Sequence, residues 1–247
     1  MKHAQHVFLI TTHVFSEEVL KRYQLIRDAA SAYGEALLLF HQTGDTMPDG
    51  LDGIPHHAFT NAILQELQYK PIAATLVPGS NHFPLLQYYL QHPEHKYYWY
   101  IEYDALFTGN WQLFFDELVA AEADLLSTCL ELYPKLPHWH YWDTLHHPDH
   151  NIPREQRVRS FNPVYRMSAA ALGFIHQSLT TGWSGHHEVL LPTLLYHHQF
   201  TLLDIGGRGR FTPPGFKDRF YDYRTYRYRP VFREAGPVKN KLYHPVK

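Results

Sequence analysis

The sequence has a single cysteine, Cys129, among its 247 residues. One thiol excludes an internal disulfide framework and a thiolate metal centre. No apolar run approaches the roughly 20 residues that span a bilayer, and the apolar run near the start is too short for a secretory signal. These absences predict a cytoplasmic protein with at most peripheral membrane contact.

The sequence also lacks a marked excess of positive or negative charge, since it has 22 lysines and arginines and 24 aspartates and glutamates. A net charge of −2 provides no general attraction to polyanions, so we expect no nucleic-acid partner. Neither the Rossmann fingerprint nor the P-loop occurs between the first strand and helix. These two ways of holding a nucleotide are therefore excluded.

The first forty residues predict a parallel, right-handed β-α-β unit. Residues 6–11 form a short apolar run of strand type, and residues 36–40 form a second one. Between them, Ser16 is placed to cap a helix that ends at Gly34. The apolar positions of this helix follow a spacing of three and four, as on one buried face. They are Val19, Tyr23, Ile26, Ala30 and Tyr33.

The rest of the chain continues the alternation of helices and strands. Turn residues dominate positions 41–60 and predict a loop. Pro192 is expected to bend or restart the helix in which it lies. We expect helices near 61–68, after Asn81, and from Asn110, Ser168 and His186, and strands at 97–102, 124–129, 161–167 and 200–205. The pattern predicts an α/β fold, with helices on both faces of a mostly parallel sheet and the strand at 97–102 in its middle.

Two segments depart from this pattern. Residues 131–159 contain four prolines and many Trp, Tyr and His side chains. A loop of this length is uncommon and suits either a carbohydrate-binding surface or a hydrophobic flap over the core. Residues 208–247 interleave arginines with tyrosines, which predicts either a local anion site or an ordinary exposed edge strand.

The 20 histidines often stand in adjacent pairs, as at His186 and His187. Neighbouring side chains diverge, whereas metal sites draw histidines from separate elements or from helical spacing. We therefore expect most of these histidines to be solvated, and the pattern does not favour a zinc site.

The most informative stretch is the aromatic and β-branched run 97–101, which is typical of a strand buried on both faces. It is followed by Glu102 and Asp104, whose side chains point to the same face if the chain stays extended. Open α/β sheets bind ligands at the carboxyl ends of their strands. Two close carboxylates need a cation, and a divalent ion holding a phosphate suits them. Alternatively, the pair caps the following turn and helix.

These features together resemble the GT-A class of nucleotide-sugar glycosyltransferases. The resemblance implies that Glu102-Tyr103-Asp104 corresponds to the "DXD" motif, with glutamate in place of the first aspartate. In that class the motif holds Mn²⁺ or Mg²⁺ against the donor diphosphate. His244 is similar to the histidine that completes the metal site in several members; alternatively, it is a solvated tail residue.

The resemblance also implies roles and an organisation. Glu188 would be the general base of an inverting reaction; in a retaining one it would bind acceptor, and alternatively it is only a first-turn residue that interacts with the helix dipole. Thr11, Thr12 and His13 would lie beside the nucleotide, and Asn81 is a further donor-binding candidate. The implied organisation is one GT-A-like domain over 1–247, comprising a nucleotide-sugar-binding half (1–130), an acceptor-side half (131–205) and a basic aromatic tail (206–247).

The leading hypothesis is a metal-dependent glycosyltransferase that moves a sugar from a nucleotide-diphosphate donor to a hydroxyl acceptor, in particular a glycan or polysaccharide. One alternative is a metal-dependent phosphoester hydrolase, for which His138 and His140 would be the nearest additional ligands. Another is a non-catalytic protein that binds a glycan or nucleotide through the aromatic loop and basic tail.

Overall fold

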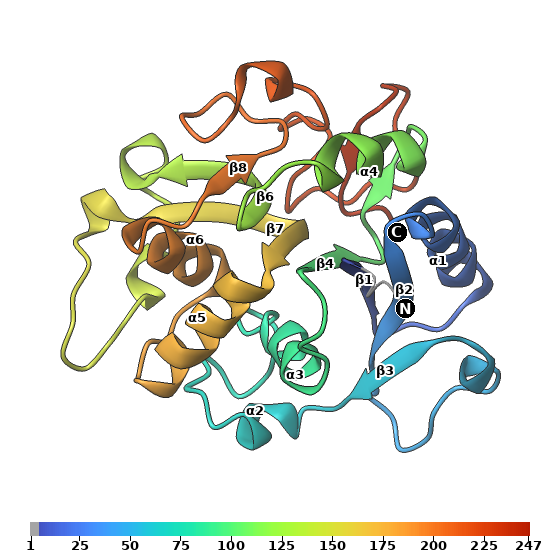
Figure 1. Cartoon of the computed structure of the whole chain (residues 1–247), viewed down its shortest axis with the longest axis horizontal. Helices are drawn as coiled ribbons and strands as arrows, with labels where there is room; N and C mark the ends of the chain where they lie inside the picture. Colours follow the sequence, from blue (N-terminus) through green and yellow to red (C-terminus); the bar gives the residue numbers. More distant parts are fainter. Residues whose placement is uncertain (1–4) are drawn as a thin grey trace.

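A seven-stranded sheet with the order β3-β2-β1-β4-β7-β6-β8 runs through the molecule (Figure 1). The computed structural model describes residues 5–247. The strands are β1 (His6–Thr12), β2 (Gly34–His41), β3 (His56–Phe59), β4 (Tyr97–Glu102), β6 (Leu125–Leu132), β7 (Val158–Ser168) and β8 (Leu202–Asp204). Only β7 runs antiparallel to its neighbours. The predicted mostly parallel sheet with β4 in its middle is confirmed.

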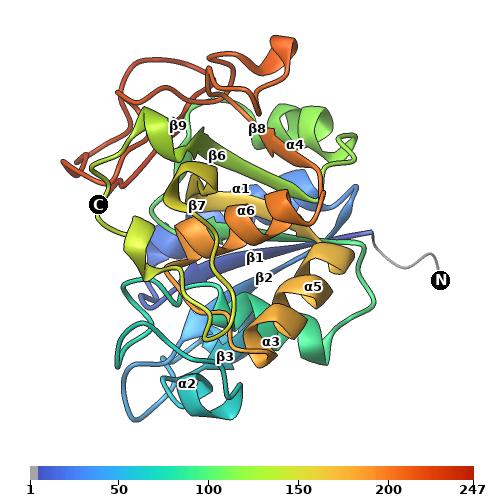
Figure 2. The same ribbon diagram turned by 90° about the vertical axis from the view of Figure 1, so that its left-hand side faces the viewer.

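Helices cover both faces of this sheet, as predicted (Figure 2). One face carries α1 (Glu17–Ala30) and α4 (Trp111–Val119), and the other carries α2 (Ile63–Glu66), α3 (Phe83–Gln91), α5 (Ala169–Thr180) and α6 (His187–His197). Strand β4 contributes Tyr98 and Tyr100 to one core, and Trp99 and Ile101 to the other. Its carboxyl end is therefore fixed between two packed layers. Within residues 5–247, no helix has the length and apolarity needed to cross a bilayer.

Side chains at the predicted positions cap three helices. The oxygens of Ser16, Asn110 and Ser168 accept backbone N–H bonds at the starts of α1, α4 and α5. Helix α6, by contrast, continues through Pro192, so the predicted restart is wrong. The proline removes the donor for the Glu188 carbonyl, and the Ser160 hydroxyl donates to that carbonyl instead, at 3.4 Å.

The segment predicted as a loop at 41–60 contains edge strand β3, and that prediction is wrong. Residues 56–59 pair in parallel with residues 38–41 of β2. His56 and His57 give this strand none of the apolar alternation that marks a half-buried strand. Pairing with β2, rather than local preference, makes it a strand.

A second, two-stranded sheet joins β5 (Leu106–Phe107) to β9 (Leu242–Tyr243), which the sequence did not predict. It brings the end of the chain beside the end of β4. There the Val246 N–H donates to the Asp104 carbonyl at 2.9 Å. The Arg22 guanidinium on α1 donates to the carbonyls of Tyr103 and Val246, at 2.8 and 3.3 Å. Helix α1 is thus hydrogen-bonded both to the turn after β4 and to the segment after β9.

The basic aromatic tail does not form one exposed face. Tyr221 and Tyr226 are buried, whereas Tyr228 is exposed. Arg219 and Arg224 form ion pairs with nearby carboxylates. The segment around these residues is not a strand, so the edge-strand alternative is wrong. Anion binding by the other arginines of this tail stays a prediction.

Arg166 on β7 closes the end of helix α4. Its fully buried guanidinium donates to the carbonyls of Leu118, Ala121 and Ala123 at 3.0, 2.6 and 2.9 Å. It also lies 4.0 Å from the centre of the Tyr97 ring. Burial lowers the pKa of Arg166 to about 10, so the group stays charged at neutral pH. The last carbonyls of a helix have no partner within it, and Arg166 supplies one here.

We expect Arg166→Met to lower the free energy of unfolding by about 3 kcal/mol or more, because it leaves buried carbonyls without donors. Urea denaturation measures this change. Arg27→Met, which alters a half-exposed arginine on α1, is the matched control and should change stability by less than about 0.5 kcal/mol. Equal effects of the two substitutions would contradict the account of Arg166.

Candidate active site

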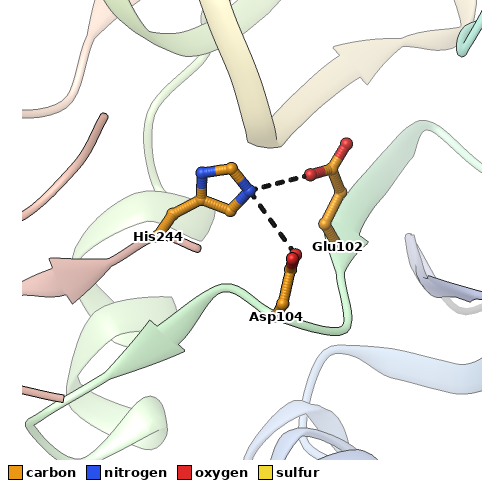
Figure 3. A group of neighbouring side chains, drawn as sticks. All are labelled: Glu102, Asp104 and His244. Atoms are coloured by element: carbon orange, nitrogen blue, oxygen red, sulfur yellow. Dashed lines mark hydrogen bonds and ion pairs between the residues drawn. The ribbon is translucent and has the colours of Figure 1, made fainter. Parts of the chain in front are cut away.

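Glu102, Asp104 and His244 meet at the carboxyl end of the central strand (Figure 3). The Nε2 atom of His244 lies 3.1 Å from a Glu102 oxygen and 3.4 Å from an Asp104 oxygen. One ligand atom from each residue lies within 4.8 Å of the others. The structure therefore brings together the three residues that the sequence proposed as metal ligands.

The two carboxylates converge through a turn and not along an extended strand. Strand β4 ends at Glu102, and the Ala105 N–H donates to the Glu102 carbonyl at 2.9 Å. The condition of an extended chain, on which the same-face argument depended, is therefore not met. The alternative that the pair caps the next helix also fails, because Asn110 caps α4. Both side chains are free to face His244.

Charge in this group is balanced by two cationic side chains. Burial opposes protonation of His244, but hydrogen bonds and charges from Asp104 and Glu102 outweigh it and raise its pKa to about 9. Burial likewise raises the pKa of Asp104, but His244 and Lys247 outweigh it and the net pKa is lowered. The Lys247 ammonium lies 3.4 Å from Asp104. His244 is 6% exposed, so the solvated-tail alternative is wrong.

The donor set fits a divalent metal ion. It offers two carboxylates, which are the ligands that hard cations prefer, and one imidazole nitrogen. The other ring nitrogen of His244 lies 3.1 Å from the Arg227 carbonyl. A hydrogen bond from Nδ1 to that carbonyl leaves Nε2 of a neutral ring facing the carboxylates, which is the usual arrangement of a histidine ligand.

Glu188 lies in the first turn of α6, and its side chain is 12% exposed. Its carboxylate accepts the Asn162 N–H at 3.3 Å. Burial raises the pKa of Glu188 to about 7, Arg159 acts in the opposite direction, and the charges of Glu102 and His244 also act on it. Glu188 thus shares the electrostatic environment of the metal-binding group. Its catalytic role stays a prediction.

The residues predicted to contact the nucleotide lie at the end of β1. Thr11 pairs with Glu102 in the sheet and accepts the Tyr103 N–H at 3.0 Å. The Thr12 hydroxyl is used locally, because it donates to the Val14 carbonyl at 2.7 Å. His13 is exposed and meets the Tyr103 ring edge-on at 5.6 Å. Thr11 and His13 therefore border the acidic motif, and nucleotide contact stays a prediction.

A group of buried histidines is the feature that the sequence missed. The expectation of solvated histidines fails for His6, His82, His95, His147, His186, His187 and His244. Of these, the ring of His187 lies 6.2 Å from that of His82 and 4.9 Å from that of His186. Burial lowers the pKa of His82 and of His186 to about 3. The adjacent pair before Glu188 was a signal, but its burial depends on contacts with His82 and with the aromatic loop.

Part of the long aromatic loop forms the predicted hydrophobic flap, whereas carbohydrate binding by the loop stays a prediction. Trp142 is buried in the core, as a hydrophobic flap requires. Tyr141 stacks on His186 with ring centres 3.9 Å apart, and Trp139 meets the same ring edge-on at 5.8 Å. The loop therefore covers the start of α6. A surface cavity of about 290 Å³ on the same loop is lined by residues 145–152 and Trp183, and by none of the predicted site residues.

Comparison with known proteins gives similarity of fold. No family model and no curated protein matches the chain. Among solved structures, it is similar to the galactosyltransferase LgtC, with 11% identity, 76% of this chain and 69% of that chain covered, and a TM-score of 0.41. It is also similar to a glycosyltransferase involved in glycosylation of the major capsid of PBCV-1, with 10% identity, 70% of this chain covered and a TM-score of 0.34. This chain spans 64% of the length of that protein. A third similar structure is the inositol-1-phosphate CTP transferase from T. maritima, with 10% identity, 81% of this chain and 84% of that chain covered, and a TM-score of 0.42.

Without metal, the protonated His244 should stabilise the fold in a pH-dependent way. Its pKa in the folded chain lies above the ordinary value, so the contribution is complete below about pH 6.5 and is lost as the pH rises to about 9. The loss should amount to roughly 3 kcal/mol at most. Urea denaturation with EDTA across this range measures it. His244→Gln should lack this slope, and an unchanged slope in the variant would contradict the assignment.

Proposed function

We propose that this chain is a metal-dependent glycosyltransferase that moves a sugar from a nucleotide-diphosphate donor to a hydroxyl acceptor. The observation that carries the proposal is the convergence of Glu102, Asp104 and His244 at the carboxyl end of β4. Open α/β sheets bind their ligands at this edge. The charges of Glu102 and His244 also act on Glu188, which supplies a titratable carboxyl group.

Donor binding is assigned to the metal-binding group and the end of β1. Glu102, Asp104 and His244 would hold Mn²⁺ or Mg²⁺, and the bound ion offsets charge on the leaving diphosphate. The nucleotide would lie beside Thr11 and His13, because these residues border the acidic motif.

Glu188 is proposed to act on the acceptor. A general base works best when its pKa lies near the working pH, and burial brings the pKa of Glu188 to about 7. In an inverting reaction its carboxylate takes the proton of the acceptor hydroxyl. In a retaining reaction the same carboxylate orients that hydroxyl through a hydrogen bond. The acceptor is proposed to be a glycan. It would bind against the aromatic loop, which contacts the start of α6 through Tyr141 and His186.

The hydrolase hypothesis finds no support in the site. His138 and His140, which would have extended the ligand set, are both exposed on the loop. Neither belongs to the metal-binding group found among residues 5–247.

Asp104→Asn should abolish Mn²⁺-dependent binding of a nucleoside diphosphate, because it removes a charged ligand. Glu102→Gln should weaken this binding less. Thermal shift with UDP, GDP, CDP and ADP, with and without Mn²⁺, identifies the nucleotide, and calorimetry measures the affinities. Asp28→Asn, an exposed carboxylate on α1, should bind as the wild type does. Unchanged Mn²⁺ affinity in both site variants would contradict the metal assignment.

Glu188→Gln should reduce turnover by about 10²–10⁴-fold while donor affinity stays constant. The assay measures release of the nucleoside diphosphate in the presence of acceptor. The melting temperature at about pH 8 should not fall. Because the pKa of Glu188 is raised in the folded chain, its charged carboxylate destabilises the fold at any pH above the ordinary pKa of a glutamate, and the substitution removes this charge.

Glu17→Gln is the matched control, since Glu17 opens α1 and its side chain is 93% exposed. This variant should keep full turnover. If Glu188→Gln retained turnover and lost only stability, Glu188 would be a structural first-turn residue.

A further inference from the structure

Two consecutive residues at the start of α3 carry buried polar atoms that have no hydrogen-bond partner in residues 5–247. They are the side-chain oxygen of Asn81 and both ring nitrogens of His82. His82 is 2% exposed. An unpaired buried polar group destabilises a fold, and native proteins contain few of them. Three such atoms in two residues therefore indicate a partner other than the protein itself.

A series of contacts connects the residues that carry these atoms to Glu188. The His82 ring lies parallel to that of His187, 6.2 Å away. The His187 Nδ1 atom lies 3.4 Å from the side-chain nitrogen of Asn162. The backbone N–H of Asn162 donates to the Glu188 carboxylate, on which the charge of Glu102 also acts. One ring contact and two hydrogen bonds thus connect His82 to Glu188.

The part of this series from Asn81 to Asn162 is polar but uncharged. Its side chains are two carboxamides and two imidazoles, and burial keeps the pKa of His82 at about 3, so this ring is neutral. A neutral imidazole donates one hydrogen bond and accepts another. The charge of the nearby cation Arg159 already acts to lower the pKa of Glu188 and that of Glu131. Glu131 lies on β6, directly opposite Arg159 on β7. Such a site matches hydroxyl groups, which also donate and accept.

We propose that Asn81 and His82 bind hydroxyl groups of the transferred sugar, and that this sugar is uncharged. The proposal rests on the proposed glycosyltransferase function. Hydroxyl groups would pair the three unpartnered atoms. The carboxylate of a uronic acid would instead be buried among neutral groups, where an uncompensated charge is strongly disfavoured.

The test starts from the nucleoside diphosphate that binds the wild-type chain with Mn²⁺. Calorimetry then compares its neutral and acidic sugars: UDP-glucose and UDP-galactose against UDP-glucuronate and UDP-galacturonate, or GDP-mannose against GDP-mannuronate. At least one neutral sugar nucleotide should bind about tenfold or more tightly than its uronate. His82→Leu should weaken binding of the neutral sugar nucleotide by about tenfold and leave the affinity for the diphosphate alone unchanged.

The melting temperature of the free protein separates sugar binding from a structural role. His82→Leu should not lower it, because an apolar side chain replaces an unpaired buried one. His6→Leu is the matched control, since buried His6 accepts a hydrogen bond from the Trp99 indole at 3.2 Å. This variant should melt at a lower temperature and keep the wild-type sugar preference. If His82→Leu does not fold, the affinities for the neutral and acidic sugar nucleotides are compared in Asn81→Ala instead, because Asn81 is less buried.

The outcomes distinguish the two proposals. If no nucleoside diphosphate binds with Mn²⁺, the proposed function and this inference both fail. If the diphosphate binds but the uronate binds as tightly as the neutral sugar, only the inference fails. It also fails if His82→Leu lowers the melting temperature and leaves the affinity for the sugar unchanged.

Discussion

Two carboxylates at the end of a strand buried on both faces impose the main constraint on this structure. Glu102 ends β4, which is held between two hydrophobic cores, and the turn that follows leaves an Asp104 oxygen within 4.8 Å of a Glu102 oxygen. Like charges at this distance need a cation. Without metal, His244 and Lys247 supply it from the last residues of the chain. The return of the tail across the sheet end, secured by β9 and Arg22, therefore has an electrostatic reason.

The same edge of the sheet collects the other polar groups of the proposed site. Helices α3 and α6 both begin there, with His82 and Glu188 at their starts. Burial disfavours the charged form of both groups: it lowers the pKa of His82 to about 3 and raises the pKa of Glu188 to about 7. Both effects cost folding free energy. In the proposed sugar transfer, both groups have a use other than stability.

Local signals were enough to predict much of the fold. The caps at Ser16, Asn110 and Ser168, together with the aromatic run of β4, predicted the main helices and the central strand. Strand β3 escaped prediction because it depends on pairing with β2, and β5 and β9 because two residues carry no periodicity.

The site was predictable where its chemistry was local and hidden where it depended on packing. The acidic motif can be read directly, and His244 was found through the resemblance to a family. The histidines at 82, 186 and 187 could not be recognised as one group, because only the folded chain brings the starts of α3 and α6 together beneath the aromatic loop. The continuation of α6 through Pro192 depends on a hydroxyl donor from β7, which is equally invisible in the local sequence.

Anomalous diffraction from crystals grown with Mn²⁺ and the nucleoside diphosphate that binds most tightly tests the central claim most directly. The account predicts one anomalous peak in contact with Glu102, Asp104 and His244, with the diphosphate on its open side and Lys247 moved away from Asp104. A peak elsewhere, or a bound diphosphate without Mn²⁺ at these three residues, would contradict it.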